Sequence, residues 1–331
     1  PVLLATMERL EHFNRQYRET ALAALLSWCE AAASSALEQL RAPFRHIALA
    51  RLADESHSTG RLITANLRAL EVAVQQPPPL TIESELAIHE ALMRDSWPSQ
   101  AGRIRDQTVW IGGHSPETAV FVPPDHTQVP QAFQDLEKFL QRTDLDPITH
   151  AAIAHAQYET IHPHTDGNGR TGRALVISQL SASGASPDLV IPISAGLLAS
   201  RTSYIEALTQ YRHGDPIRIT EVFTFAIQHA IDAAQRLHQA VQVIEDDICA
   251  SATRVTCNLQ RIARLCTREP AFTVVSVTAL GVPTASAYRL LQQLVTHGHL
   301  TPETKIRGQS VWSVPALTTA LDRFITRSNR E

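Results

Sequence analysis

A cluster of glycines interrupts the helical pattern near the middle of the chain: Gly167, Gly169 and Gly172 fall within six residues. They lie where a helix is expected to begin, and a glycine inside a helix costs roughly 1 kcal/mol relative to alanine. Arg170 and Arg173 occupy the same turn, although the helix dipole disfavours cations near a helix N-terminus. A bound anion explains both features, because glycines let backbone N–H groups approach it and arginines bind its oxygens.

Two further side chains indicate which anion would bind. Asp166 directly precedes the glycines and would repel a phosphate unless a cation lay between them, and Mg²⁺ is the usual cation. His162 lies before Pro163, where a neutral imidazole can take a proton from a hydroxyl that attacks phosphorus. The loop therefore predicts Mg²⁺-assisted attack on a nucleotide phosphate.

The whole string, from His162 to Arg173, resembles the Fic family signature H-x-F-x-[D/E]-G-N-G-R-x-x-R. It differs at one position, because His164 replaces the phenylalanine that usually anchors the loop in the core. The resemblance implies a protein that transfers AMP from ATP to a Ser, Thr or Tyr hydroxyl of a target protein. It implies the following roles: His162 as catalytic base, Asp166 as Mg²⁺ ligand, and Gly167, Asn168, Gly169, Arg170 and Arg173 as the ATP-binding residues.

Residues 107–124 contain two short β-prone runs around Gly112-Gly113, and this pattern predicts a hairpin. By resemblance to the family, the hairpin is a flap that pairs with the backbone of the target and presents its hydroxyl, a form of β-augmentation. A structural ribbon is the alternative. The expected flap residues are Trp110, Ile111, Gly112, Val120, Phe121 and Val122.

The segment from Ser34 to Gln39 resembles the inhibitory motif [S/T]-x-x-x-E-[G/N] of the family, with Gln39 in place of Gly or Asn. By this resemblance Ser34 and Glu38 form a brake, in which the Glu38 carboxylate pairs with Arg173 and takes the arginine that the γ-phosphate of ATP requires. A bidentate Arg–carboxylate pair can mimic an Arg–phosphate pair. The alternative is a solvated glutamate on a helix surface.

Most of the remaining chain is expected to be helical. Residues 17–40 are rich in Ala and Leu, and Asp146-Pro147 is typical of a helix start. We predict a mainly α protein with a Fic-like helical core, a β-hairpin flap and a small C-terminal winged-helix domain. The expected division is 1–75 with the inhibitory motif, 76–235 as the core, 236–270 as a helical connector and 271–331 as the winged helix-turn-helix.

The charge of the C-terminal unit gives little support for DNA binding. Residues 271–331 contain six Lys or Arg and three Asp or Glu, so their net charge is only +3. The expected recognition helix puts Ala287, Leu290, Leu291 and Leu294 on one face and offers Arg289, Gln292 and Gln293 on the other, a thin basic surface for DNA. A protein-contact module is at least as well supported.

The composition argues against several classes of protein. The net charge of −4 provides no overall basic field for nucleic acid. No apolar run is long enough for a membrane span. The four cysteines form no C-x-x-C pair, which argues against a zinc site or a disulfide framework and fits a cytoplasmic protein with reduced thiols.

Several readings of the function stay open at this point. Gly169 favours transfer of AMP over transfer of phosphate, because the related Doc-type kinases carry lysine there. One alternative is a de-AMPylating hydrolase in which Glu38 positions water, and another is a DNA-binding regulator with a nucleotide-sensing Fic core. The expected partners are a target protein with a hydroxyl side chain, a second copy of the chain, as substrate or in a homo-oligomer, and DNA at residues 271–331.

Overall fold

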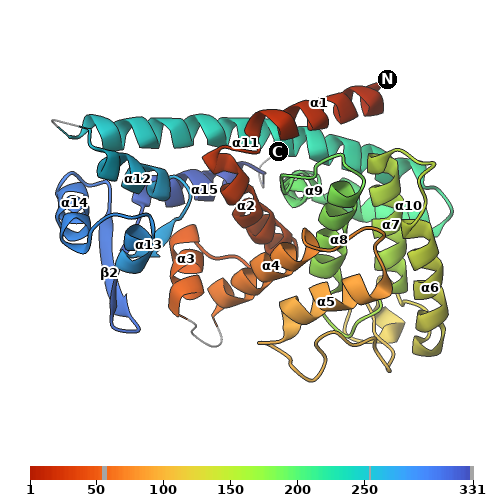
Figure 1. The fold of residues 1–331 in the computed structure, drawn as a ribbon. Coiled ribbons are helices and arrows are strands. Elements are labelled where there is room, and N and C mark those ends of the chain that lie inside the picture. Colours follow the sequence, from red (N-terminus) through yellow and green to blue (C-terminus); the bar gives the residue numbers. More distant parts are fainter. Residues whose placement is uncertain (54–57, 253–254, 329–331) are drawn as a thin grey trace.

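The computed structural model describes residues 1–53, 58–252 and 255–328. It is mainly helical, as predicted, with a small sheet near the C-terminus (Figure 1). The helical core consists of α1 (Val2–Tyr17), α2 (Ala21–Leu37), α3 (Phe44–Ala53), α4 (Thr59–Ala73), α5 (Ile82–Met93), α6 (Val129–Leu140), α7 (Pro147–Ile161), α8 (Asn168–Ala182), α9 (Ile193–Ala199), α10 (Arg201–Arg212) and α11 (Ile217–Ala250), with the 3-10 turns η1 (Pro116–Thr118) and η2 (His126–Gln128).

The two helices around the glycine cluster begin and end as local sequence dictates. The Asp146 carboxylate caps α7 by accepting hydrogen bonds from the N–H groups of Ile148 and Thr149, at 3.1 and 2.9 Å. Proline follows at the first helical position, where no N–H is needed, so the predicted start is confirmed. α8 packs against α7, α2, α4 and α5. The loop between α7 and α8 therefore lies at the ends of two buried helices.

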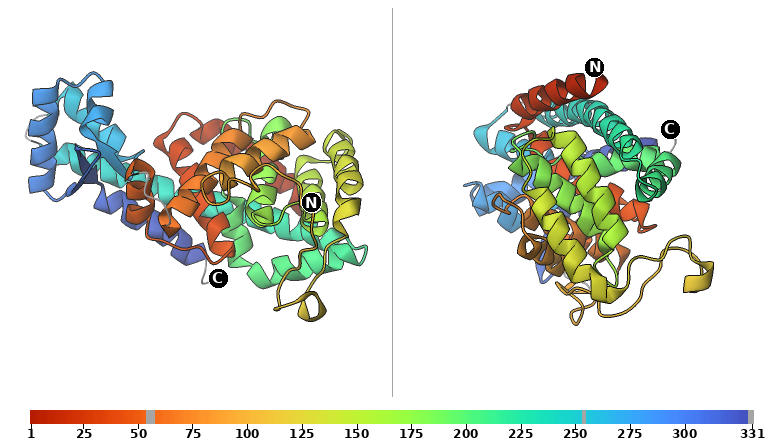
Figure 2. Two further views of the ribbon diagram at one scale, coloured as in Figure 1. Left: turned by 90° about the horizontal axis from the view of Figure 1, so that it is seen from below. Right: turned by 90° about the vertical axis from the view of Figure 1, so that its right-hand side faces the viewer.

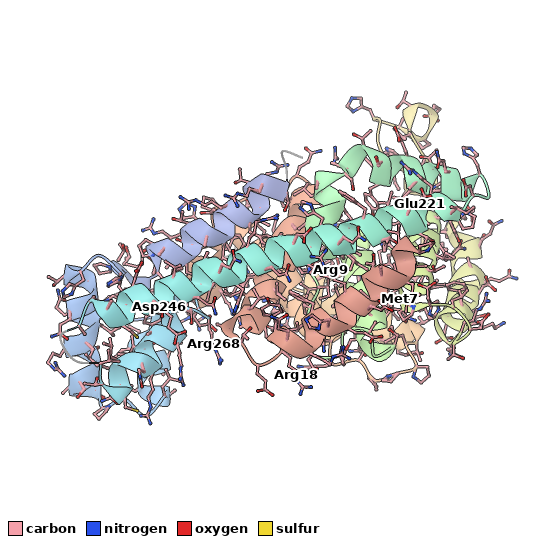
Figure 3. The ribbon with its side chains drawn as sticks, turned by 90° about the horizontal axis from the view of Figure 1, so that it is seen from above. Met7, Arg9, Arg18, Glu221, Asp246 and Arg268 are labelled. Atoms are coloured by element: carbon pink, nitrogen blue, oxygen red, sulfur yellow. The ribbon has the colours of Figure 1, made fainter. Side chains whose placement is uncertain are left out.

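The longest helix, α11, connects the core with the C-terminal unit. It has 34 residues, and Figure 3 shows it running from Glu221 beside the core to Asp246 beside the C-terminal unit. Arg9 of α1 forms an ion pair with Asp232 of α11. The boundary predicted between core and connector, at residues 235 and 236, falls inside this helix. The division into core and connector therefore stays a prediction. No helix in the described part of the chain combines the length and the apolar character that crossing a membrane requires.

The C-terminal unit combines helices with an antiparallel sheet. In the sheet the strand order is β1-β3-β2, with Phe272 opposite Trp312 and Glu303 opposite Val311. The four apolar residues predicted for one face of α14 are buried, while Arg289 is exposed. A winged helix-turn-helix and a DNA-binding role stay predictions. The elements are α12 (Cys257–Cys266), β1 (Ala271–Thr273), α13 (Val274–Ala279), α14 (Thr284–Thr296), β2 (Thr301–Ile306), β3 (Gln309–Ser313) and α15 (Pro315–Ser328).

The last helix, α15, turns back onto the core, a contact that the sequence does not reveal. It packs against α2, α3, α9 and α11 and buries Phe324 on the core side. Asp322 of α15 accepts a hydrogen bond from the Phe44 N–H at 2.9 Å, and Arg45 donates to Glu303 of β2 at 2.7 Å. The C-terminal unit thus contacts the segment that directly follows the expected inhibitory motif (Figure 2).

The predicted hairpin at residues 107–124 is only partly formed. It contains a single antiparallel bridge, in which the Ile111 N–H donates to the Phe121 carbonyl at 2.8 Å. Gly112 and Gly113 both have positive φ, and η1 follows them, so the connection is longer than the tight turn that continues a ladder. The tip stands away from the body of the molecule (Figure 2). The flap is therefore a loop closed at its base.

Candidate active site

Tertiary packing favours glycine at all three positions of the cluster, which are the last loop residue before α8 and two positions in its first turns. Gly167 has φ 83°, and a Cβ there would lie 3.1 Å from Met93 Sδ of α5. A Cβ at Gly169 would overlap Glu38 Oε1, and one at Gly172 would lie 2.7 Å from the Tyr158 ring. At all three positions the backbone lies close to protein neighbours, which is a different reason for glycine from the bound anion that the sequence predicts. The first N–H groups of a helix have no acceptor within it, so the start of α8 is suited to binding an anion.

His164 anchors the loop through hydrogen bonds, where a phenylalanine would use apolar contact alone. Its side chain is fully buried, and Nδ1 donates to the Arg103 carbonyl at 2.7 Å. Nε2 lies 2.7 Å from Glu85 Oε1, which also accepts from the Tyr158 hydroxyl at 2.6 Å. Glu85 thus ties α5 to α7 and to the loop. Glu85 is not among the residues expected from the sequence, because nothing in its local pattern marks a buried carboxylate.

His89, which belongs to α5 like Glu85, also supports the loop. Its ring stacks on His164 with 3.6 Å between centroids. Nδ1 accepts a hydrogen bond from the Gly102 N–H at 3.0 Å, so Nε2 carries the proton and donates to the Asp166 carbonyl at 3.0 Å. Burial, followed by the neighbouring His164, lowers the pKa of His89 to about 4, so the ring is neutral near pH 7. This neutral tautomer holds the backbone of Asp166.

The side chain of Asn168 closes the loop on itself. Its Oδ1 accepts from the His164 N–H at 2.9 Å, and its Nδ2 donates to the His164 carbonyl at 2.8 Å. The side chain of Asn168 is thus occupied within the loop, and its contact with a nucleotide stays a prediction.

His162 ends α7 in a left-handed conformation, with φ 51° and ψ 64°. Its N–H donates to the Tyr158 carbonyl and its carbonyl accepts from Arg105 Nε, each at 2.8 Å. Arg105 is buried and also donates to the Pro124 carbonyl at 2.6 Å, which joins the loop to the base of the flap. The side chain of His162 is 17% exposed, and its Nδ1 lies 3.7 Å from Glu159 Oε2.

The structure brings together the residues of the expected brake. Arg173 is buried and donates through Nε to Ser34 Oγ, and through NH2 to the Ser34 carbonyl and to Glu38 Oε1, all at 2.9 Å. Burial lowers the pKa of the Arg173 guanidinium, but Glu38 and other nearby groups raise it by more, so it stays charged. Arg170 is also buried and lies 3.7 Å from the exposed carboxylate of Asp166.

Gln39 ends α2 in the left-handed region, with φ 63°. The Leu40 N–H donates to the Ser35 carbonyl and the Gln39 N–H to the Ala36 carbonyl, both at 3.0 Å, which is the Schellman pattern. Glycine or asparagine is favoured at this position for that reason. The turn forms with glutamine as well. The chain that follows it reaches α15, where the Phe44 N–H donates to Asp322.

Gln39→Gly is expected to raise the free energy of unfolding by about 1 kcal/mol, because glycine removes the cost of left-handed backbone for an L-residue. Chemical denaturation of the full chain measures this difference. Gln39→Ala is the matched control and should show no such gain, since alanine keeps its Cβ. Equal stability of the glycine variant and the wild type would show that this turn carries no strain.

Two cavities meet at the loop. One, of about 540 Å³, is lined by Glu38, His162, Gly169 and Arg173, by the flap and by α10. The other, of about 600 Å³, is lined by Asp166 and the start of α8. Volumes of this size suit a nucleotide. Of the predicted flap residues, Trp110, Ile111, Gly112, Val120 and Phe121 line one or both cavities, while Val122 lies on the exposed surface.

The flap is held against α10 by a cation–π contact, since the Arg212 guanidinium lies 3.7 Å from the centre of the Phe121 ring.

Asp166 is the residue of the loop that is predicted to bind a metal ion. The described residues include no group of three or more His, Cys, Asp or Glu that could hold a metal ion. Asp166 offers one exposed carboxylate, and Mg²⁺ commonly binds one or two carboxylates together with substrate phosphates and water. Asp166 therefore fits a cation that is bound jointly with a nucleotide.

Comparison with known proteins adds the family. The chain is similar to the protein adenylyltransferase Fic of Nematostella vectensis, with 31% identity over 160 residues, which cover 48% of this chain and 35% of that protein. It is also similar to the protein adenylyltransferase fic-1 of Caenorhabditis elegans, with 30% identity over 175 residues, which cover 52% of this chain and 31% of that protein. The chain thus spans about a third of the length of these relatives.

Solved structures show the same fold at lower identity. A Fic family protein from Desulfovibrio desulfuricans G20 matches 95% of this chain and 96% of its own, with a TM-score of 0.60 and 20% identity. Fic-1 from C. elegans matches 71% of this chain and 69% of its own, with a TM-score of 0.54 and 22% identity. These matches confirm the predicted fold class. Residues 79–180 match the Fic/DOC family, and this segment includes the loop and the start of α8 near its C-terminal end.

Proposed function

We propose that this chain is a protein adenylyltransferase that transfers AMP from ATP to a hydroxyl of a protein. The observation that carries the proposal is one cavity lined by His162, Gly169 and Arg173 at the start of a buried helix. This arrangement combines a base, backbone donors and a fixed cation, which attack on a phosphate requires. The similarity to two protein adenylyltransferases supports the same reaction.

The proposed reaction uses the residues of this loop in distinct roles. The hydroxyl oxygen of the target attacks the α-phosphorus of ATP, and its proton passes to His162. A new O–P bond forms, the bond from the α-phosphorus to the oxygen that bridges to the β-phosphorus breaks, and pyrophosphate leaves. The N–H groups at the start of α8, with Arg170 and Arg173, bind the phosphate oxygens. Mg²⁺ bound by Asp166 would neutralise phosphate charge.

The flap provides the docking site for the target in this proposal. Trp110, Val120 and Val122 are large apolar residues with 42%, 77% and 43% of their surface exposed. Exposed apolar side chains next to a single β-bridge suit the binding of an extended peptide segment, which adds backbone hydrogen bonds to the flap edge. The serine, threonine or tyrosine of such a segment would then face His162.

Glu38 acts as a brake in the same proposal. Its carboxylate lies over Gly169 and bonds to Arg173, so it occupies the place where phosphate oxygens would bind. The brake belongs to α2, which is held by packing against α4, α8, α9 and α11. The unmodified chain is therefore expected to have low activity until Glu38 leaves this position.

The reaction is tested by incubating the Glu38→Gly variant with cell lysate and ATP that carries the label on either the α- or the γ-phosphate. Transfer of AMP leaves label on protein only from α-labelled ATP, whereas transfer of phosphate leaves it only from γ-labelled ATP. Protein labelled from the γ-phosphate alone would overturn the proposal.

A hydrolase acting on the same site is the second candidate, because Glu38 and His162 together line both cavities, and a carboxylate there could position water. Release of AMP from a previously modified target by wild type, but not by Glu38→Gly, would favour this reaction.

Asp166→Ala is expected to lower AMP transfer and to raise the Mg²⁺ concentration needed for half-maximal rate, because it removes the carboxylate that fits the cation. The measurement is a Mg²⁺ titration of the transfer rate in the Glu38→Gly background. Asp135→Ala, which removes an exposed carboxylate of α6, is the control. If the titrations with and without Asp166 superimpose, Asp166 is not a ligand.

A further inference from the structure

Glu159 lies on the last turn of α7, three residues before His162, so both side chains project from the same side of the helix end. Its carboxylate is buried, and Oε2 is 3.7 Å from His162 Nδ1. Glu159 Oε1 and His162 Nδ1 are both buried, and neither finds a hydrogen-bond partner among the residues that the structure describes. The unpartnered ring nitrogen of His162 thus faces Glu159 Oε2, while the unpartnered Oε1 of the same carboxylate lies nearest to His155.

The charge state of Glu159 suits this contact. Burial raises the pKa of its carboxyl, but His162, His155 and Arg173 lower it by more, to about 2, so Glu159 is a carboxylate near pH 7. His155 lies 3.9 Å from Glu159 Oε1, but burial lowers its pKa to about 4 and its Nε2 bonds to the Tyr204 hydroxyl at 2.7 Å.

Two guanidinium groups complete the surroundings of Glu159. Arg173, on α8, is bonded to Ser34 and Glu38. Arg212, on α10, lies over the Phe121 ring. Arg173 is therefore engaged elsewhere, whereas Arg212 Nε has no hydrogen-bond partner among the described residues. The contact from His162 Nδ1 to the buried carboxylate, at 3.7 Å, is shorter than that from His155, at 3.9 Å.

We propose that Glu159 is a positioning residue, which accepts a hydrogen bond from Nδ1–H of His162 and so keeps Nε2 unprotonated and directed at the cavity. This inference rests on the proposed function, in which His162 is the base. A gap of 3.7 Å is longer than a hydrogen bond, but such contacts are often long without substrate and tighten in the reacting complex. The carboxylate also stabilises the imidazolium that forms when His162 takes the proton.

The main chain of His162 is fixed, so only its ring remains to be positioned. The N–H and carbonyl of His162 are already held by Tyr158 and Arg105. Ring rotation and proton location remain, and Glu159 sets both. Glu159 and His162 line one cavity together with Gly169 and Arg173, the residues of the proposed phosphate site.

The direct test is the tautomer of His162, measured by long-range ¹H–¹⁵N correlation on the full chain labelled with ¹⁵N-histidine, at a pH where the ring is neutral. His162→Ala identifies the signal among the fifteen histidines. We expect wild type to carry the proton on Nδ1, and Glu159→Gln to shift the population towards Nε2–H. Glu206→Gln, which removes an exposed carboxylate of α10, should leave the spectrum of His162 unchanged.

The kinetic test uses the Glu38→Gly background and single-turnover rates. Glu159→Gln is expected to lower kcat about tenfold with little change in KM for ATP, because a charge-assisted hydrogen bond to the imidazolium is lost. An unchanged kcat, or a wild-type His162 that carries its proton on Nε2, would overturn the inference. The wild-type spectrum needs no variant, so it decides even if Glu159→Gln does not fold. If no labelled protein forms in any background, the proposed function fails while the tautomer result stands.

Discussion

His162→Ala is expected to lower the rate of AMP transfer by about 10²–10⁴-fold, the usual contribution of a general base, while ATP binding is largely retained. The two effects separate because the anion site consists of other groups. In the proposed site the start of α8 and Arg173 bind phosphate, whereas His162 ends α7 at the other end of the loop. Removing the imidazole leaves the hydrogen bonds of its backbone to Tyr158 and Arg105 unchanged.

The measurement pairs a single-turnover rate with calorimetric ATP binding, both in the Glu38→Gly background. His213→Ala, which removes an exposed histidine after α10, is the control and should match the parent in both. A His162→Ala variant that turns over at the rate of its parent would remove His162 from the role of base. A loss of ATP binding of the same size would instead indicate that the loop has collapsed.

Glu38→Gly is expected to raise AMP transfer roughly ten- to a hundredfold above wild type. Arg173 can bond to the carboxylate of Glu38 or to the γ-phosphate of ATP, but not to both. A charge-assisted hydrogen bond contributes about 1.5–3 kcal/mol, and each 1.4 kcal/mol corresponds to about tenfold in binding. Glu38 belongs to the same chain as Arg173, so it competes at a high effective concentration.

Two variants make the activation specific. Glu38→Gln keeps the shape of the side chain but removes its charge, and should activate in part. Arg173→Ala should not activate, because it deletes the phosphate-binding group together with the brake. Equal labelling by wild type and Glu38→Gly would contradict the inhibitory role of Ser34 and Glu38, and it would leave the assignment of the catalytic loop untouched.

Local sequence was sufficient for the parts of the site that depend on neighbours along the chain. The Asp146 cap, the start of α8 and the positive φ of Gly167 follow from residues within a few positions, because helix ends are governed by local hydrogen bonds and dihedral preferences. Glu159 also left a signal, since a glutamate three residues before His162 at a helix end shares its side of the helix. This spacing could have been recognised before the structure.

Long-range packing determined the other parts of the site. Glu38 meets Arg173 across 135 residues, and Glu85 meets His164 across 79. Such pairs depend on how α2 and α5 pack around α8, and no periodicity in the sequence encodes that orientation. The same holds for the flap, where β-prone residues predicted a hairpin but the long glycine-containing connection leaves one bridge. The chemistry of the loop therefore depends on residues that are adjacent in the sequence. Its anchor and its proposed brake depend instead on hydrogen bonds between buried polar groups of distant helices, because buried polar groups require partners.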